Sequence, residues 1–110
     1  MKRIDLIVSH EHLPELNAIA YKHKVGGITF YSTKGRGHSK LEPVDAGRGV
    51  IRYTPEFQVR MKCEILVQDA TVKSVVDEIL DVLSAGSSPD GMILVYNIED
   101  TYDIRAKRER

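Results

Sequence analysis

The sequence has only one cysteine, no long apolar run and no excess of basic residues. Its single cysteine, Cys63, excludes an internal disulfide and a zinc site built from several cysteines. No apolar run approaches the ~18–20 residues of a membrane span, and the first residues lack the apolar stretch of a signal peptide. The 16 basic residues are balanced by 16 acidic ones. These absences predict a cytoplasmic protein with no membrane insertion and no nucleic-acid partner.

What is present suits one folded domain spanning residues 1–110. Hydrophobic residues make up 42% of the chain and charged residues 29%, a balance that argues against disorder. The zero net charge also removes a barrier to self-association.

Hydrophobic periodicity predicts four strands and two helices. Alternating or continuous apolar residues predict strands at about 2–9, 28–33, 57–68 and 92–98. Apolar residues spaced by three and four predict helices at about 13–24 and 72–83. The order predicts an α+β fold, a ferredoxin-like βαββαβ sandwich with a long loop between strands 2 and 3. The helices would cover one sheet face. Apolar residues remain for both sides, namely Ile7, Phe30, Tyr31 and those of the last strand, and this predicts an oligomer that hides the other face.

Two loops could hold an anion. Lys34 to Lys40 is rich in glycine and basic residues, and irregular sequence continues to about Pro55. The spacing fits neither a Walker loop nor a dinucleotide fingerprint. Gly86 to Gly91 forms a second turn, which gains interest only if it meets the first loop in space, within one chain or between neighbouring subunits.

The remaining candidate residues favour no enzyme. His10 and His12 lack a third ligand at a diagnostic metal spacing, so a polar strand-to-helix junction is favoured and no metal site is predicted. Cys63 alternates with apolar residues and is expected in the core. No nucleophile with a base and no convincing pair of carboxylates is present.

Six short segments, in order along essentially the whole chain, resemble the PII nitrogen-regulatory signal-transduction family. They are Met1–Asp5, Val25–Thr29, Thr33–Gly37, Arg60–Ile65, Asp90–Gly91 and Asp103–Arg105. The resemblance implies a homotrimer with inward-facing sheets and adenine-nucleotide sites in the clefts between subunits. The loop at about 37–55 looks like the T-loop, through which the family regulates ammonium transporters or metabolic enzymes. Family members sense ATP against ADP, and many sense 2-oxoglutarate through Mg-ATP.

The resemblance also implies roles for individual residues. The positions matching the family's nucleotide contacts are Ile7, Gly27, Thr29, Gly35, Arg36, Gly37, His38, Glu64, Leu66, Pro89, Asp90, Gly91, Met92 and Arg105. The candidates for 2-oxoglutarate or another anion are Ser39, Lys40 and Arg60, and Tyr53 aligns with the modifiable T-loop tyrosine. The charged tail covers about 99–110.

Departures from the family pattern fall at the phosphate positions. Met92 replaces a lysine, Asp103 and His38 each replace an arginine, and Pro89 replaces a glycine. Ser39 replaces a glutamine that coordinates Mg and contacts 2-oxoglutarate. Because charge-assisted bonds to phosphate are strong, these changes predict a less charged nucleotide such as ADP, AMP or a cyclic nucleotide. They weigh against a 2-oxoglutarate response.

The alternative is a CutA-like trimer that binds metal or acts structurally. His10 and His12 give it slight support, while the long basic loop and the Lys34–Gly37 turn count against it.

Overall fold

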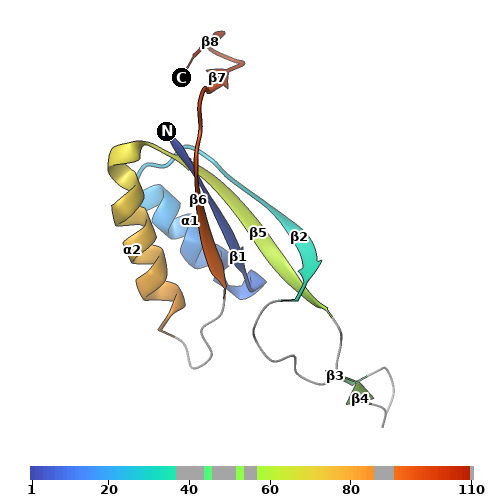
Figure 1. The fold of residues 1–110 in the computed structure, drawn as a ribbon. Helices are drawn as coiled ribbons and strands as arrows, with labels where there is room; N and C mark the ends of the chain where they lie inside the picture. Colours follow the sequence, from blue (N-terminus) through green and yellow to red (C-terminus); the bar gives the residue numbers. More distant parts are fainter. Residues whose placement is uncertain (37–43, 46–51, 54–56, 86–90, 110) are drawn as a thin grey trace.

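The structure is a computed structural model, and it describes residues 1–36, 44–45, 52–53, 57–85 and 91–109. The main elements follow the order strand, helix, strand, strand, helix, strand (Figure 1). They are β1 (Lys2–Val8), α1 (Leu13–Lys22), β2 (Ile28–Gly35), β5 (Gln58–Val67), α2 (Val72–Leu83) and β6 (Met92–Asn97). Two short helical turns, η1 (His10–His12) and η2 (Asp69–Thr71), precede the helices.

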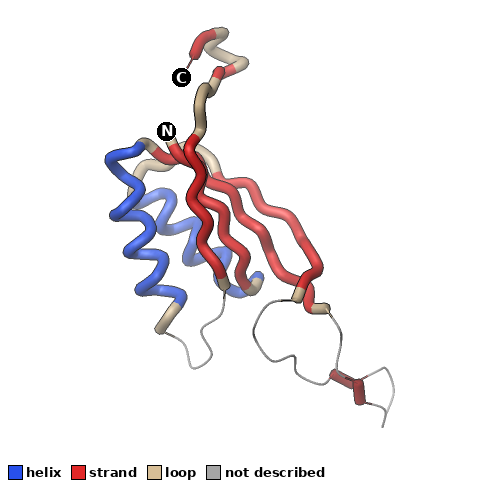
Figure 2. The backbone as a smooth tube through the Cα atoms, viewed as in Figure 1, coloured by secondary structure: helices blue, strands red, loops and turns tan. Residues whose placement is uncertain are grey.

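The four long strands form one antiparallel sheet in the order β2-β5-β1-β6. Both helices lie against the same face of this sheet, as the tube view shows (Figure 2). The predicted α+β fold, with two helices and a four-stranded antiparallel sheet, is therefore confirmed. We refer to the two sides of the sheet as the covered face and the open face.

The core lies between the covered face and the helices. Alternation in β1 sends Ile4, Leu6 and Val8 to this face, and all three are fully buried. Their buried partners come from α1, β5 and α2, and they are Leu16, Ile19, Cys63, Ile65, Val67, Val75 and Ile79. Burial raises the pKa of the Cys63 thiol. Cys63 is thus a core residue, as its alternating sequence predicts.

The structure contains strand residues that the sequence patterns did not predict. β2 continues through Lys34 to Gly35, so these residues belong to the sheet rather than to the basic loop. Within the predicted long loop the structure describes a pair of two-residue strands, β3 (Val44–Asp45) and β4 (Arg52–Tyr53). After β6, the tail forms another small pair, β7 (Tyr102–Asp103) and β8 (Arg108–Glu109).

The junction between α1 and β2 contains an unusual backbone conformation. Lys24 has a φ of 55°, in the left-handed region where glycine is the favoured residue. This conformation lets the Val25 amide donate to the Ala20 carbonyl at 2.9 Å, closing the end of α1. The chain then enters β2 through Gly26 and Gly27.

Polar contacts join the two helices to each other and the amino terminus to the turn before α2. Glu78 of α2 accepts a hydrogen bond from Lys22 at 2.9 Å and pairs with His23 at 2.5 Å, joining the two helices. Both partners hold the pKa of Glu78 below its usual range, Lys22 more than His23. The amino group of Met1 lies 2.8 Å from Asp69 and lowers the pKa of that carboxyl.

Candidate functional site

The open face carries rows of cross-strand neighbours, which follow from the strand register. The first row is Tyr31, Lys62, Ile7 and Met92; the second is Thr29, Glu64, Asp5 and Leu94; the third is Leu66, Arg3 and Tyr96. Predicted nucleotide residues lie at one end of each row: Ile7 and Met92 in the first, Thr29 and Glu64 in the second, and Leu66 in the third. The open face therefore carries part of the predicted site.

A polar network runs through these rows around Asp5, which is 0% exposed. Arg3 Nη2 donates to Asp5 Oδ2 at 3.2 Å, and Arg3 Nε lies 2.9 Å from Oδ1. Lys62 Nζ approaches Oδ2 to 3.6 Å from the next row. The guanidinium of Arg3 also lies 4.5 Å above the centre of the Tyr96 ring. A buried carboxylate is costly unless cations pair with it, and two cations do so here.

The network continues to Glu64 through Tyr31. The Tyr31 hydroxyl donates to Glu64 Oε1 at 3.0 Å. Tyr31 and then Asp5 raise the pKa of Lys62, and the hydrogen bond to Asp5 does most to raise the pKa of Arg3. Arg3, Asp5, Lys62, Tyr31 and Glu64 thus form one connected polar cluster, which we call the open-face network.

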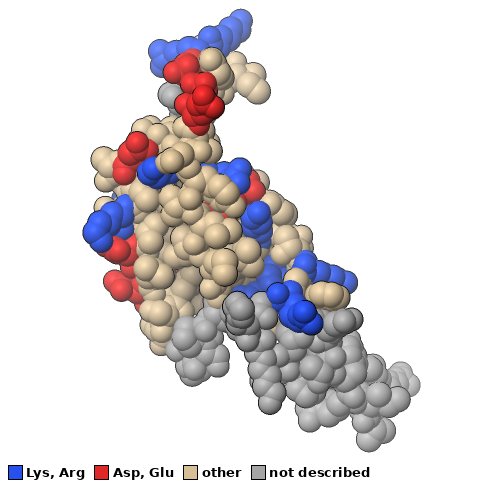
Figure 3. Space-filling model, viewed as in Figure 1, with Lys and Arg blue, Asp and Glu red and all other residues tan. Residues whose placement is uncertain are grey.

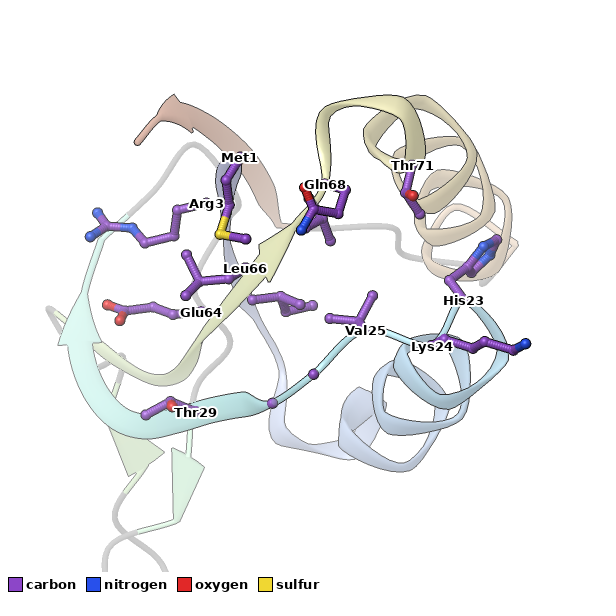
Figure 4. A pocket seen from close by; sticks show the side chains of 14 residues that line it. Met1, Arg3, His23, Lys24, Val25, Thr29, Glu64, Leu66, Gln68 and Thr71 are labelled. Carbon is purple, nitrogen blue, oxygen red and sulfur yellow. The ribbon is translucent and has the colours of Figure 1, made fainter. Parts of the chain in front are cut away.

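A pocket of about 420 Å³ opens where α1 runs into β2 beside the end of β5. Its lining includes four of the predicted nucleotide residues, namely Gly27, Thr29, Glu64 and Leu66. Figure 4 shows Arg3 and Glu64 extending in the same direction, while His23 lines the opposite side. Lys24 lines the rim, and its side chain points away from the pocket (Figure 4).

A second group of predicted residues lies on the other edge strand. Gly91 has a φ of 133°, and a Cβ at this position would lie 2.7 Å from the Ile7 carbonyl oxygen. This close approach holds Gly91 against β1 and places Met92 opposite Ile7. Met92 is 51% exposed. Only glycine suits this combination of φ and contact.

A third group lies at the far end of β2. Gly35 ends the strand opposite Gln58, and the exposed Arg36 follows it. Arg60, the candidate for a carboxylate anion, donates to Gln58 Oε1 at 2.8 Å. The Arg60 carbonyl accepts a hydrogen bond from Thr33 at 3.1 Å. The backbone and side chain of Arg60 are thus tied to neighbouring residues at this end of the sheet.

These groups do not converge within one chain. Gly27 and Thr29 lie at the start of the edge strand β2, and Gly91 and Met92 lie at the start of the other edge strand, β6. The two edges are three strand spacings apart, which is about 14 Å. Gly35 lies six positions after Thr29 along β2, a distance of about 20 Å. The open-face network fills the space between the edges. One chain therefore presents separate parts of the predicted site.

The tail that carries Arg105 leaves the sheet after β6 (Figure 1). Basic residues gather at its tip, with acidic residues between them and the body (Figure 3). Asp103 Oδ1 accepts a hydrogen bond from the Ala106 amide at 3.1 Å, which closes the turn between β7 and β8. Asp103, noted in the sequence only as a departure, therefore has a structural role in the tail.

Several predicted residues lie outside the part of the chain that the structure describes. They are Gly37, His38, Ser39, Lys40, Pro89 and Asp90. Tyr53 is described only as part of β4. Among the described elements, neither helix has the length and apolar character to span a bilayer. His12 of the strand-to-helix junction contacts Glu15 at 3.3 Å.

Comparison with known proteins decides the family. The family model described as "Nitrogen regulatory protein P-II" matches residues 1–108. The chain belongs to the P-II family. It is 31% identical over 105 residues to "Nitrogen regulatory protein P-II" of Rhodospirillum rubrum, covering 96% of this chain and 92% of that protein. It is 30% identical over 109 residues to "Nitrogen regulatory protein P-II 1" of Escherichia coli K12, covering 99% and 96%.

The P-II match confirms the resemblance that the six segments carry, and with it the assignment to nitrogen-regulatory signal transduction. The roles of the individual residues stay predictions. Sequence reasoning missed the open-face network, because Arg3, Asp5 and Lys62 look like ordinary charged residues in alternating strands. The one available signal was Asp5 between the core residues Ile4 and Leu6, in the middle of a strand.

Proposed function

We propose that this P-II family member is a regulatory protein, not an enzyme, that binds an adenine nucleotide in clefts between the subunits of a homotrimer. We further propose that it acts in the cytoplasm, regulating a partner of nitrogen or carbon metabolism, such as an ammonium transporter or an enzyme, through its T-loop at about 37–55. The match of the family model to P-II over residues 1–108 counts against the alternative of a CutA-like trimer.

The observation that carries the proposal is the division of the predicted nucleotide residues between opposite edges of the sheet. Gly27, Thr29 and Glu64 surround the pocket at one edge, while Ile7, Gly91 and Met92 lie toward the other. A second copy that brings its β6 edge to this pocket would complete the site. A closed ring of copies would then contain one site for each chain.

The chemistry of the described residues favours a ligand with few phosphates. Met92 supplies no charge beside Gly91, and Asp103 is engaged in the tail turn. Arg36 and Arg105 are exposed cations that remain available to a phosphate. We therefore propose ADP or AMP as the preferred ligand over ATP, with Mg as a candidate cofactor and without the usual 2-oxoglutarate response.

The test is isothermal titration of the purified protein with ATP, ADP and AMP, each with Mg, with and without 2-oxoglutarate. We expect saturable binding near one nucleotide per chain, with ADP or AMP tighter than ATP. Light scattering of the same sample should give the mass of three chains. Absence of heat with all three nucleotides would overturn the proposal.

A further inference from the structure

Tyr31 lies beside the predicted nucleotide pocket without being part of any motif. It is 43% exposed, on the open face of an edge strand, so its ring is not a core residue. Its hydroxyl nevertheless donates a hydrogen bond of 3.0 Å to Glu64, which lines the pocket. An exposed tyrosine on an edge strand does not need this contact for packing. The hydrogen bond from Tyr31 to Glu64 therefore points to a role in the pocket that Glu64 lines.

Glu64 has competing partners on the open face. Arg3 lines the same pocket, extends in the same direction (Figure 4) and attracts the Glu64 carboxylate electrostatically. Arg3 is already held by Asp5 and by the Tyr96 ring. With Arg3 so engaged, the Tyr31 hydroxyl binds one oxygen of Glu64, Oε1.

A carboxylate held at one oxygen presents the other in a defined direction. An ionised carboxylate only accepts hydrogen bonds, so Glu64 can contact only the donors of a nucleoside. In adenosine these are the ribose hydroxyls and the amino group of the base. The orientation of Glu64 therefore decides how well such a donor is recognised.

We propose that Tyr31 is a positioning residue for the nucleotide site: its hydroxyl fixes the Glu64 carboxylate so that this group recognises a hydrogen-bond donor of the nucleoside. The inference rests on the proposed nucleotide binding and adds a determinant of specificity to it. Tyr31→Phe retains the ring but removes the hydroxyl. The loss should weaken ADP binding by roughly threefold to tenfold, the equivalent of one hydrogen bond.

The experiment compares ADP with two groups of analogues, the 2′- and 3′-deoxy forms and inosine diphosphate. Each analogue lacks one donor that Glu64 could recognise. Isothermal titration of Tyr31→Phe should show weaker ADP binding and a smaller preference for ADP over one of the analogues. Tyr21→Phe is the matched control, because Tyr21 is exposed on α1 outside the pocket of Glu64, and it should behave like the wild type. In a Glu64→Ala background, Tyr31→Phe should have no further effect.

The other outcomes distinguish a failure of the Tyr31 inference from a failure of the proposed nucleotide binding. If the wild type binds ADP and Tyr31→Phe binds all ligands equally well, the positioning role is wrong. The role is also wrong if Tyr31→Phe weakens every ligand by the same factor, since this indicates a general structural effect. Failure of the wild type to bind any ligand would overturn the proposed nucleotide site, and this inference with it.

Discussion

The two faces of the sheet bury side chains by different means. On the covered face, Ile4, Leu6 and Val8 are buried by apolar contacts with the helices. On the open face, Asp5 is equally buried between the same residues of β1, but charged and aromatic neighbours surround it. Burial on one face removes apolar surface from water, and burial on the other requires partners for a charge.

This difference also concerns how closely each face fixes the direction of its side chains. Apolar contacts are non-directional, and the helices already complete them on the covered face. The polar contacts are directional, and they hold Glu64 in place at the pocket. Other members of the open face, including Tyr31, Leu66, Met92 and Tyr96, are exposed in the single chain.

The largest expected effect compares adjacent residues of β1 that point to opposite faces. Leu6→Ala should lower the free energy of unfolding by about 2–5 kcal/mol, because it leaves a cavity in the core. Asp5→Asn retains the volume but removes the charge paired with Arg3, and should cost about 1.5–3 kcal/mol. Urea denaturation measures both. If Asp5→Asn is neutral, the charge pairing of the open face is not a source of stability.

The next prediction concerns the close approach of β6 to β1. Gly91→Ala should destabilise the protein by about 1–3 kcal/mol, because Gly91 has a positive φ and a Cβ would lie 2.7 Å from the Ile7 oxygen. Gly35→Ala is the matched control, since a Cβ there meets nothing within 4 Å. Thermal melting should separate the two variants. Equal melting temperatures would show that β6 can move away from β1 without cost.

Charge on the open face can be tested at Met92. Met92→Lys adds a cation beside Gly91 and should tighten ATP binding about tenfold, equivalent to about 1.4 kcal/mol. Tyr21→Lys also adds a lysine at an exposed side chain, on α1 and outside the pocket that Gly91 and Met92 line. Titration with ATP should show no gain for that control. A gain of equal size in both variants would indicate a nonspecific effect of net charge.

A smaller effect is expected where the helical layer joins the sheet. Lys24→Gly should raise the free energy of unfolding by roughly 0.5–1 kcal/mol, because glycine adopts a φ of 55° without the steric cost of a side chain. Lys22→Gly, at the last residue of α1, should instead destabilise, because glycine disfavours the helix and the contact with Glu78 is lost. Urea denaturation distinguishes these signs. A loss of stability for Lys24→Gly would show that the lysine side chain contributes more than its backbone conformation costs.

The smallest effect concerns the polar contact between the helices, and it depends on pH. Lys22 and His23 lower the folded-state pKa of Glu78, so its contribution is present above the ordinary glutamate pKa of about 4.3. The contribution is lost as pH falls through the lower folded value. Glu78→Gln should therefore melt below the wild type at pH 7, and this difference should disappear in acid. Asp81→Asn, at an exposed position of the same helix, should show no such trend.

The sequence was sufficient for what depends on local patterns. Alternation predicted β1 and β5 to within a residue or so at each end, and helical spacing predicted α2. It could not predict that β2 continues to Gly35, because Lys34 and Gly35 have the composition of a loop and are held in the sheet by β5. The sequence patterns also did not predict the turn between β7 and β8, which the hydrogen bond from the Ala106 amide to Asp103 closes.

The site was predictable only through the family resemblance. Cross-strand neighbours such as Thr29 and Glu64 are 35 positions apart in sequence, and only the register brings them together. The same holds for Tyr31 and Glu64, whose contact crosses from one strand to the next. Composition and periodicity carry no information about such pairs.

The division of the predicted site between the two sheet edges has a genetic consequence. In the proposed ring, chains whose pocket is blocked at Gly27 and chains defective at Gly91 would each fail to bind nucleotide when alone, yet each retains the part that the other has lost. When the two are refolded together at equal amounts, about one cleft in four of a closed ring joins two intact parts. Two inactive alleles of this gene should therefore complement one another in the same cell.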